Sequence, residues 1–185
     1  MPAEGGAATS VTHNASGALQ PSWSPDGASI VFIARTPDSV FARVIHRANG
    51  AWTSGSNVAT LRRAGSHPRF SPDGRQLLAI DTRTVITTSA SGGAVRALFA
   101  PPGWAAFLAT WAGDGQSVYV LASDSGALLH LMSVPLAGAP RRLIRFDDPV
   151  RQPTRYGLVA RGGRIYFTYG EREADIAVMP IGRRR

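Results

Sequence analysis

The sequence contains no cysteine among its 185 residues. Disulfide bonds, thiolate nucleophiles and cysteine-ligated metal sites are therefore excluded. Lysine is missing too, so all 20 basic residues are arginines, and with 12 acidic residues the formal net charge is +8. Arginine pairs well with carboxylates and phosphates, which allows an acidic partner. We expect this charge mainly to form a solvated basic surface.

Long apolar stretches are missing as well. No run approaches the roughly 18 apolar residues that a membrane-spanning helix requires, so no membrane span is predicted. The first six residues have neither the basic nor the apolar stretch of a signal peptide, which leaves the compartment open. Charged residues make up 17% and hydrophobic residues 44%, which is typical of a globular chain and enough for one domain with a core.

A motif built around Ser-Pro-Asp-Gly recurs along the chain. Full copies occupy residues 24–27 and 71–74, a third keeps Asp114-Gly115, and a fourth has decayed to Gly162-Gly163. Each copy follows a bulky apolar residue and precedes a short apolar run. The preceding residues are Trp23, Phe70, Trp111 and Leu158. Their spacing of about 41 to 47 residues is typical of four-stranded propeller blades.

The physical chemistry of a tight turn explains this motif. Proline presets φ near −65° at the second position, aspartate suits the third, and glycine takes the left-handed conformation that follows. An alternative is a ring of carboxylates that binds a cation or a basic peptide. We prefer the structural interpretation, because a turn demands the same residue at the same repeat position. The residues of this structural turn motif are Pro25, Asp26, Gly27, Pro72, Asp73, Gly74, Asp114 and Gly115.

The segments between the turns predict further strands. Third strands are expected at 42–46, 84–88, 128–132 and 175–179, and fourth strands at 57–61, 94–99 and 141–145, with no amphipathic helix. We therefore predict an all-β fold, a β-propeller of about four four-stranded blades. The single domain spans residues 1–185, with blades at about 14–62, 63–99, 100–145 and 146–182 plus 8–13.

The pattern Pro-x-aromatic-Ser-Pro-Asp-Gly followed by an apolar strand resembles the WD40-like PD40 repeats of TolB-type propellers. The resemblance covers nearly the whole chain and implies a β-propeller. Relatives of the TolB type usually have six blades, so this chain could be part of a larger six- to eight-bladed ring. The resemblance also implies a protein of the cell envelope, periplasmic or otherwise extracytoplasmic, or the sensor half of a larger regulator.

The two ends of the chain predict how the ring is completed. Residues 8–13 have the pattern of the outer strand that the last repeat lacks, so we expect them to pair with residues 174–180. This pairing would close four blades into a ring without a long unpaired edge. The alternative is that a second copy, as a homodimer, or further sequence completes a larger ring.

The aromatic residues before the turns, Trp23, Phe70 and Trp111, could form an aromatic cage for a ligand. Their fixed repeat position instead favours packing between blades. On that interpretation, replacing Trp23 by alanine lowers the free energy of unfolding by roughly 3–5 kcal/mol.

No catalytic, metal-ligating or cofactor-binding residue is predicted. The sequence lacks a Gly-x-Ser-x-Gly elbow and a His-Glu-x-x-His motif, and its four histidines fall at different repeat positions. His67 precedes Pro68 at the start of an inner strand, where it could face the central channel. Five arginines cluster around Asp147-Asp148 as a candidate binding surface. The arginines of this cluster are Arg141, Arg142, Arg145, Arg151 and Arg155, and His67 is a separate candidate for the binding surface.

Three functions compete on this evidence. The first, which we favour, is a non-catalytic scaffold that binds a protein or another ligand. The second is a propeller accessory to a peptidase or another hydrolase. The third is binding of a polyanion through the arginine-rich loops. Nucleic acid is the least favoured partner, because aromatic residues are not interleaved with the arginines as base stacking requires.

Overall fold

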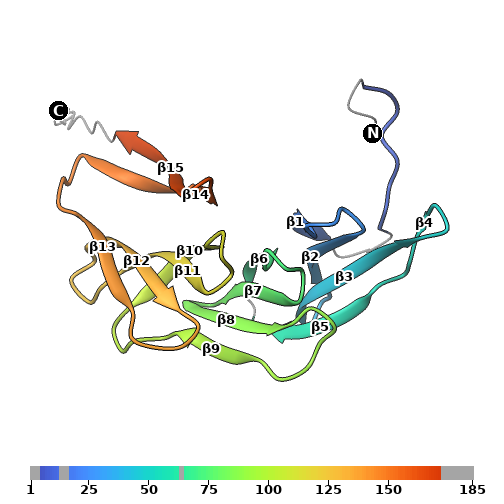
Figure 1. Cartoon of the computed structure of the whole chain (residues 1–185), viewed down its shortest axis with the longest axis horizontal. Helices are drawn as coiled ribbons and strands as arrows, with labels where there is room; N and C mark the ends of the chain where they lie inside the picture. The colour runs from blue at the N-terminus through green and yellow to red at the C-terminus, as the bar shows by residue number, and fades with distance from the viewer. Residues whose placement is uncertain (1–4, 13–16, 63–64, 172–185) are drawn as a thin grey trace, which may run out of the picture.

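The computed structural model describes residues 5–12, 17–62 and 65–171, which contain β-strands and no helix. The strands form four antiparallel sheets (Figure 1). The first sheet contains β1 (Ala18–Trp23), β2 (Ser29–Arg35), β3 (Val40–Ala48), β4 (Ala51–Trp52) and β5 (Ser56–Leu61). The second contains β6 (Ser66–Phe70), β7 (Gln76–Asp81), β8 (Thr84–Ser89) and β9 (Arg96–Phe99). The third contains β10 (Ala105–Trp111), β11 (Ser117–Ser123), β12 (Leu129–Pro135) and β13 (Arg141–Phe146), and the fourth β14 (Arg151–Arg161) and β15 (Arg164–Glu171).

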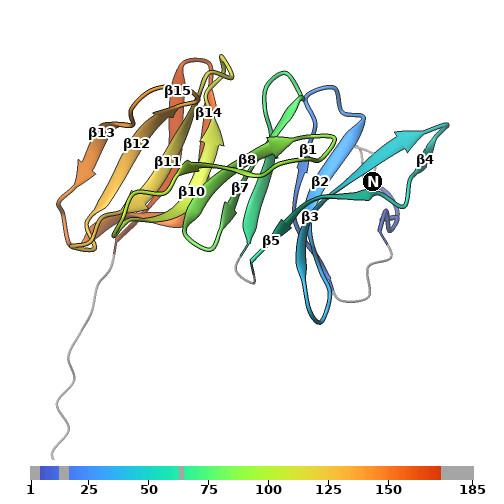
Figure 2. The same ribbon diagram turned by 90° about the horizontal axis from the view of Figure 1, so that it is seen from below.

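The sheets follow one another around an open arc. In Figure 1 the first strand of each sheet, β1, β6, β10 or β14, lies on the concave side, and the outer strands β5, β9 and β13 lie on the convex side. Figure 2 shows the sheets standing side by side like blades. The predicted all-β propeller architecture is therefore confirmed, as a partial ring. The described residues contain no helix that could cross a membrane.

The core lies between blades rather than inside them. Because side chains alternate along a strand, each blade has a leading face toward the previous blade and a trailing face toward the next one. Val31 and Ile33 on the trailing face of the first blade pack against Leu77 and Ala79 on the leading face of the second. Two further clusters join the second blade to the third and the third to the fourth. Uninterrupted apolar runs, such as residues 30–34 of β2, suit a strand covered on both faces.

The leading face of the first blade differs from this pattern. Trp23 is 59% exposed, although Trp111 at the equivalent position is 5% exposed. Trp111 has the second blade against it and donates its indole N–H to the carbonyl of Arg69 at 3.4 Å. No blade in the described part of the chain precedes Trp23, which contacts Trp52 of its own sheet at 5.7 Å between ring centroids. The expected burial of Trp23 between blades is therefore wrong for this chain.

The predicted completion of the last blade by the N-terminus also needs correction. Residues 8–12 form no strand, and Ser10–Thr12 line a hollow with Phe32 and Trp52 of the first blade. Figure 1 shows this N-terminal segment on the opposite side of the arc from β14 and β15. Residue 13 and the expected partner, residues 174–180, lie outside the described residues. The segment lies on the first blade because apolar surface is available there.

Candidate functional site

The four inner strands share an irregularity on the concave side of the arc. Their ladders shift register between Leu19 and Ser22, between Ser66 and Arg69, between Ala106 and Leu108, and between Pro153 and Leu158. Such bulges redirect side chains and often lie next to functional sites. Each shift lies just before or at the bulky apolar residue of its repeat, so repeat equivalence places the four shifts at a similar level around the concave edge.

Gln20 and His67 occupy equivalent bulges in the first two blades. Each lies three residues before the aromatic residue of its strand and directly before a proline. Their φ angles, 53° and 55°, are in the left-handed region that residues other than glycine seldom adopt. Such strained positions cost about 1–3 kcal/mol each and concentrate at functional sites. The backbone N–H of His67 donates to Oε1 of Gln20 at 2.8 Å, which ties the two blades together at this edge.

His67 and Arg69 bring partly buried polar groups to the same edge. Nδ1 of His67 and Nε of Arg69 are buried without a hydrogen-bond partner among the described residues. Burial, and secondarily the charge of Arg69, lower the pKa of His67 below its usual value, so the imidazole is neutral at pH 7. Burial also lowers the pKa of Arg69, which nevertheless keeps its charge at this pH. The edge therefore combines a neutral imidazole with a cation that needs an acceptor.

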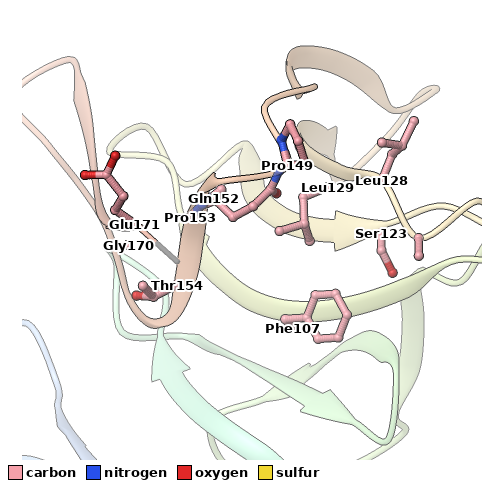
Figure 3. A pocket seen from close by; sticks show the side chains of 11 residues that line it. Phe107, Ser123, Leu128, Leu129, Pro149, Gln152, Pro153, Thr154, Gly170 and Glu171 are labelled. Atoms are coloured by element: carbon pink, nitrogen blue, oxygen red, sulfur yellow. The ribbon is translucent and has the colours of Figure 1, made fainter. Parts of the chain in front are cut away.

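A groove of about 800 Å³ continues this edge between the third and fourth blades (Figure 3). Phe107 from the bulge of β10 and Thr154 from the bulge of β14 both line it. The remaining lining is mostly apolar, with Glu171 at one side in an ion pair to Arg151 at 3.0 Å. Together the bulges provide polar groups at one end of the concave side and an apolar groove at the other.

The residues of the structural turn motif occupy the turns between first and second strands. Oδ1 of Asp73 accepts hydrogen bonds from the Ser71 hydroxyl at 2.6 Å and from the Arg75 amide at 3.0 Å. These bonds lower the pKa of Asp73, the serine bond contributing most, and Asp26 behaves likewise with Ser24 and Ala28. Asp114 accepts from the Gln116 amide at 2.9 Å. The glycines Gly27, Gly74 and Gly115 have φ of 70°, 73° and 68°.

The proline at the second turn position has a further role. A Cβ added to Gly74 would lie 3.7 Å from Pro25, and one added to Gly115 would lie 3.6 Å from Pro72. Each turn thus packs against the turn of the previous blade. The turn carboxylates accept hydrogen bonds from their own turns, and the turns pack against one another. Both kinds of contact are structural.

Four of the five predicted arginines have described side chains, and these four lie on two different strands. Arg141, Arg142 and Arg145 lie on β13, the outer strand of the third blade, whereas Arg151 begins the inner strand β14. Arg145 pairs with Asp147 at 2.5 Å, and Arg151 pairs with Glu171. Arg155 also lies on β14, but its side chain is outside the described residues. Of the predicted binding residues with described side chains, His67 lies in a bulge of the concave edge, and the backbone of Arg155 falls within the bulge of β14.

Sequence reasoning missed Gln20, Arg69, Phe107 and Thr154. One signal was present: Gln20-Pro21 and His67-Pro68 have the same spacing to the following aromatic residue. A polar residue before proline at a fixed repeat position indicates a recurring backbone break in the inner strand. Phe107 and Thr154 could not be found from this sequence signal, because neither of them precedes a proline.

No family model matches the sequence, and no curated protein matches it either. Solved structures do match. A TolB-type protein from Agrobacterium tumefaciens aligns with a TM-score of 0.56 at 15% identity, over 70% of this chain and 50% of that chain. TolB from Acinetobacter baumannii aligns with a TM-score of 0.57 at 16% identity, over 82% of this chain and 40% of that one. An acylaminoacyl peptidase in complex with Z-Gly-Gly-Phe-chloromethyl ketone aligns with a TM-score of 0.56 at 14% identity, over 82% and 35%.

The sheets, the inner-strand bulges and these alignments define a β-propeller. More particularly, the fold is that of a TolB-like propeller. The chain spans half or less of the length of the structures that it matches. Because an enzyme is among them, the fold by itself assigns no reaction.

Proposed function

We propose that this chain is a non-catalytic, TolB-like scaffold that binds an acidic protein segment along its concave edge. The observation that carries the proposal is the pair of buried polar atoms, Nδ1 of His67 and Nε of Arg69, that have no hydrogen-bond partner in the described structure. Leaving such groups unsatisfied costs about 1–3 kcal/mol each, and more for a charged group. A bound carboxylate or carbonyl oxygen would remove that cost for Arg69, and a bound donor or acceptor, according to the tautomer, would do so for Nδ1 of His67.

The shape of the concave edge supports an extended ligand rather than a small ion. The unpartnered polar groups of His67 and Arg69 lie on β6 of the second blade, and the groove lined by Phe107, Leu129 and Pro153 lies between the third and fourth blades. A protein segment with an acidic residue and an apolar residue several positions away could contact both. Loops and bulges on a rigid scaffold are favourable places for such recognition. By the same resemblance to TolB, we propose an extracytoplasmic site of action.

Selection from a random peptide library on the immobilised chain tests this function. We expect acidic peptides to be enriched and their affinity to fall at least tenfold in Arg69→Gln, which keeps a polar side chain without the charge. The control is Arg142→Gln, an exposed arginine on the outer strand β13, which should leave affinity unchanged. No enrichment of acidic peptides, or equal losses in both variants, would reject the concave edge as the binding site.

A further inference from the structure

A hollow of about 560 Å³ lies on the first blade and shares no residue with the concave edge. Strands β2 and β3 contribute Phe32, Arg43 and Ile45 to its lining, and β4 contributes Trp52. The N-terminal segment Ser10–Thr12 lines another side. Phe32 and Ile45 are only 3% and 2% exposed, so the hollow is a pocket within the fold. Its volume is in the range of about 300–1,000 Å³ that is common for small-molecule sites.

Arg43 places a charge in this hollow where the other blades have an apolar residue. The pairing of second and third strands makes Arg43 equivalent to Ile86 and Met132, which are buried in apolar clusters between blades. Nε of Arg43 is also buried, and it has no hydrogen-bond partner among the described residues. No acidic residue occurs among the described residues that line the hollow. A buried, permanently charged guanidinium without an acceptor indicates that an anion is its missing partner.

The rest of the lining restricts the chemistry of that anion. The side chains of Phe32, Ile45 and Trp52 suit a ligand with an apolar body. Oγ1 of Thr53, which also lines the hollow, accepts the backbone N–H of His46 at 3.0 Å and can still donate its own proton to a ligand. One guanidinium and one hydroxyl match a single carboxylate, whereas a phosphate would need more charge-assisted donors.

We propose that this hollow binds a small organic monocarboxylate, whose carboxylate pairs with Arg43 and whose apolar body lies against Trp52. This site is separate from the acidic protein segment proposed for the concave edge, and it takes a ligand of a different size. Another protein surface would fit poorly, because Ser10–Thr12 occupy one side of the hollow and Phe32 is already buried.

Isothermal titration calorimetry with phenylacetate, hydrocinnamate, isocaproate and their neutral amides tests this site on the full chain. We expect at least one acid to bind with a dissociation constant of about 1 mM or lower, and its amide to bind at least tenfold more weakly. Arg43→Met should weaken binding of that acid at least tenfold. The matched control is Arg142→Met, at an exposed position of β13, which should leave the affinity unchanged. The proposal is overturned if none of the acids binds or if the amides bind equally well.

Two further measurements separate a binding role of Arg43 from a structural one. Arg43→Met introduces the side chain that the third blade has at this position, so the midpoint of urea unfolding without ligand should not fall. A lower midpoint together with unchanged binding would make Arg43 a structural residue.

Nuclear magnetic resonance of the wild-type chain locates the ligand without any substitution. Saturation with the acid that binds should shift the indole N–H signal of Trp52 and leave that of Trp111, which is buried between the second and third blades. An unmoved Trp52 signal would place the acid elsewhere and reject the hollow as its site. Arg69→Gln should leave the affinity for the acid unchanged, so this site and the concave edge can fail independently.

Discussion

At the scale of single residues, position in the arc matters more than position in the repeat. Trp23 and Trp111 precede equivalent turns, yet only Trp111 has another blade against its ring. Repeat periodicity predicts the direction of a side chain, because it fixes strand register. It does not predict whether a neighbouring blade is there to bury that side chain.

This difference in burial predicts that replacing the two tryptophans by alanine lowers the stability of the chain by unequal amounts. In urea unfolding of the monomeric chain, Trp111→Ala should lower the free energy of unfolding by about 3–5 kcal/mol through the cavity it leaves. Trp23→Ala should lower it by only about 1 kcal/mol, the value of one aromatic contact with Trp52. Equal losses would mean that the first blade is covered in the monomer.

The turn carboxylates predict a dependence of stability on acid. The pKa of Asp73 in the folded chain lies below its ordinary value of 3.8, mainly because of the Ser71 hydroxyl. As pH falls, the unfolded chain therefore binds a proton first. The stabilisation is fully present above the ordinary pKa and is lost as pH falls through the folded-state pKa. Asp73→Asn and Ser71→Ala should each flatten the decline of unfolding free energy below about pH 4, measured by urea titration. A slope identical to wild type would contradict this role for the bond.

The turn residues could be identified from sequence because their chemistry is local. Proline, aspartate and glycine impose the turn through their own φ preferences and short hydrogen bonds. The bulge residues Gln20 and His67 could not, since their left-handed backbones are joined by a hydrogen bond between blades, across 47 residues of sequence. Local preference alone argues against that conformation for either residue.

At the scale of elements, the first blade departs most from the repeat. Strand β3 pairs with β4 at one end and with β5 at the other, and the chain passes between these two strands through Gly55. Gly55 has a φ of +77°, and an added Cβ would lie 2.6 Å from Cγ2 of Ile45 and 2.7 Å from the carbonyl oxygen of Val44. Both the backbone conformation and the close approach require glycine here.

Gly55→Ala should therefore lower the free energy of unfolding by about 2–4 kcal/mol, from backbone strain plus steric overlap. Gly50 provides the matched control. Its φ is +80°, but an added Cβ would meet nothing within 4 Å, so Gly50→Ala should cost only about 1 kcal/mol of backbone strain. Chemical denaturation of both variants gives the steric contribution as the difference. No difference between them would place Gly55 in a more open site than the structure shows.

Most elements could be predicted from the sequence because short apolar runs between turn residues allow few alternatives. The expected outer strands at 57–61, 94–99 and 141–145 correspond to β5, β9 and β13. The short strand β4 was not predicted, since two residues carry no periodic pattern. The placement of residues 8–12 was wrong, because a strand-like composition does not specify which sheet edge or face a terminal segment contacts.

At the scale of the whole molecule, stability is shared unevenly. In an array of blades, each blade is stabilised mainly by its neighbours, so an end blade with one neighbour should open more readily than a central one. The second and third blades have neighbours on both faces. The first and fourth blades expose Trp23 and Tyr166 on the faces that have no neighbouring blade within the described chain.

Hydrogen exchange should reveal this gradient of local stability along the arc. At low protein concentration, amides of β1 and of β14–β15 should exchange about tenfold faster or more than those of β7 and β11, since one lost junction is worth at least about 1.4 kcal/mol of local stability. If all four blades were equally protected in the dilute wild-type chain, contact with a neighbouring blade would not be the main source of local stability.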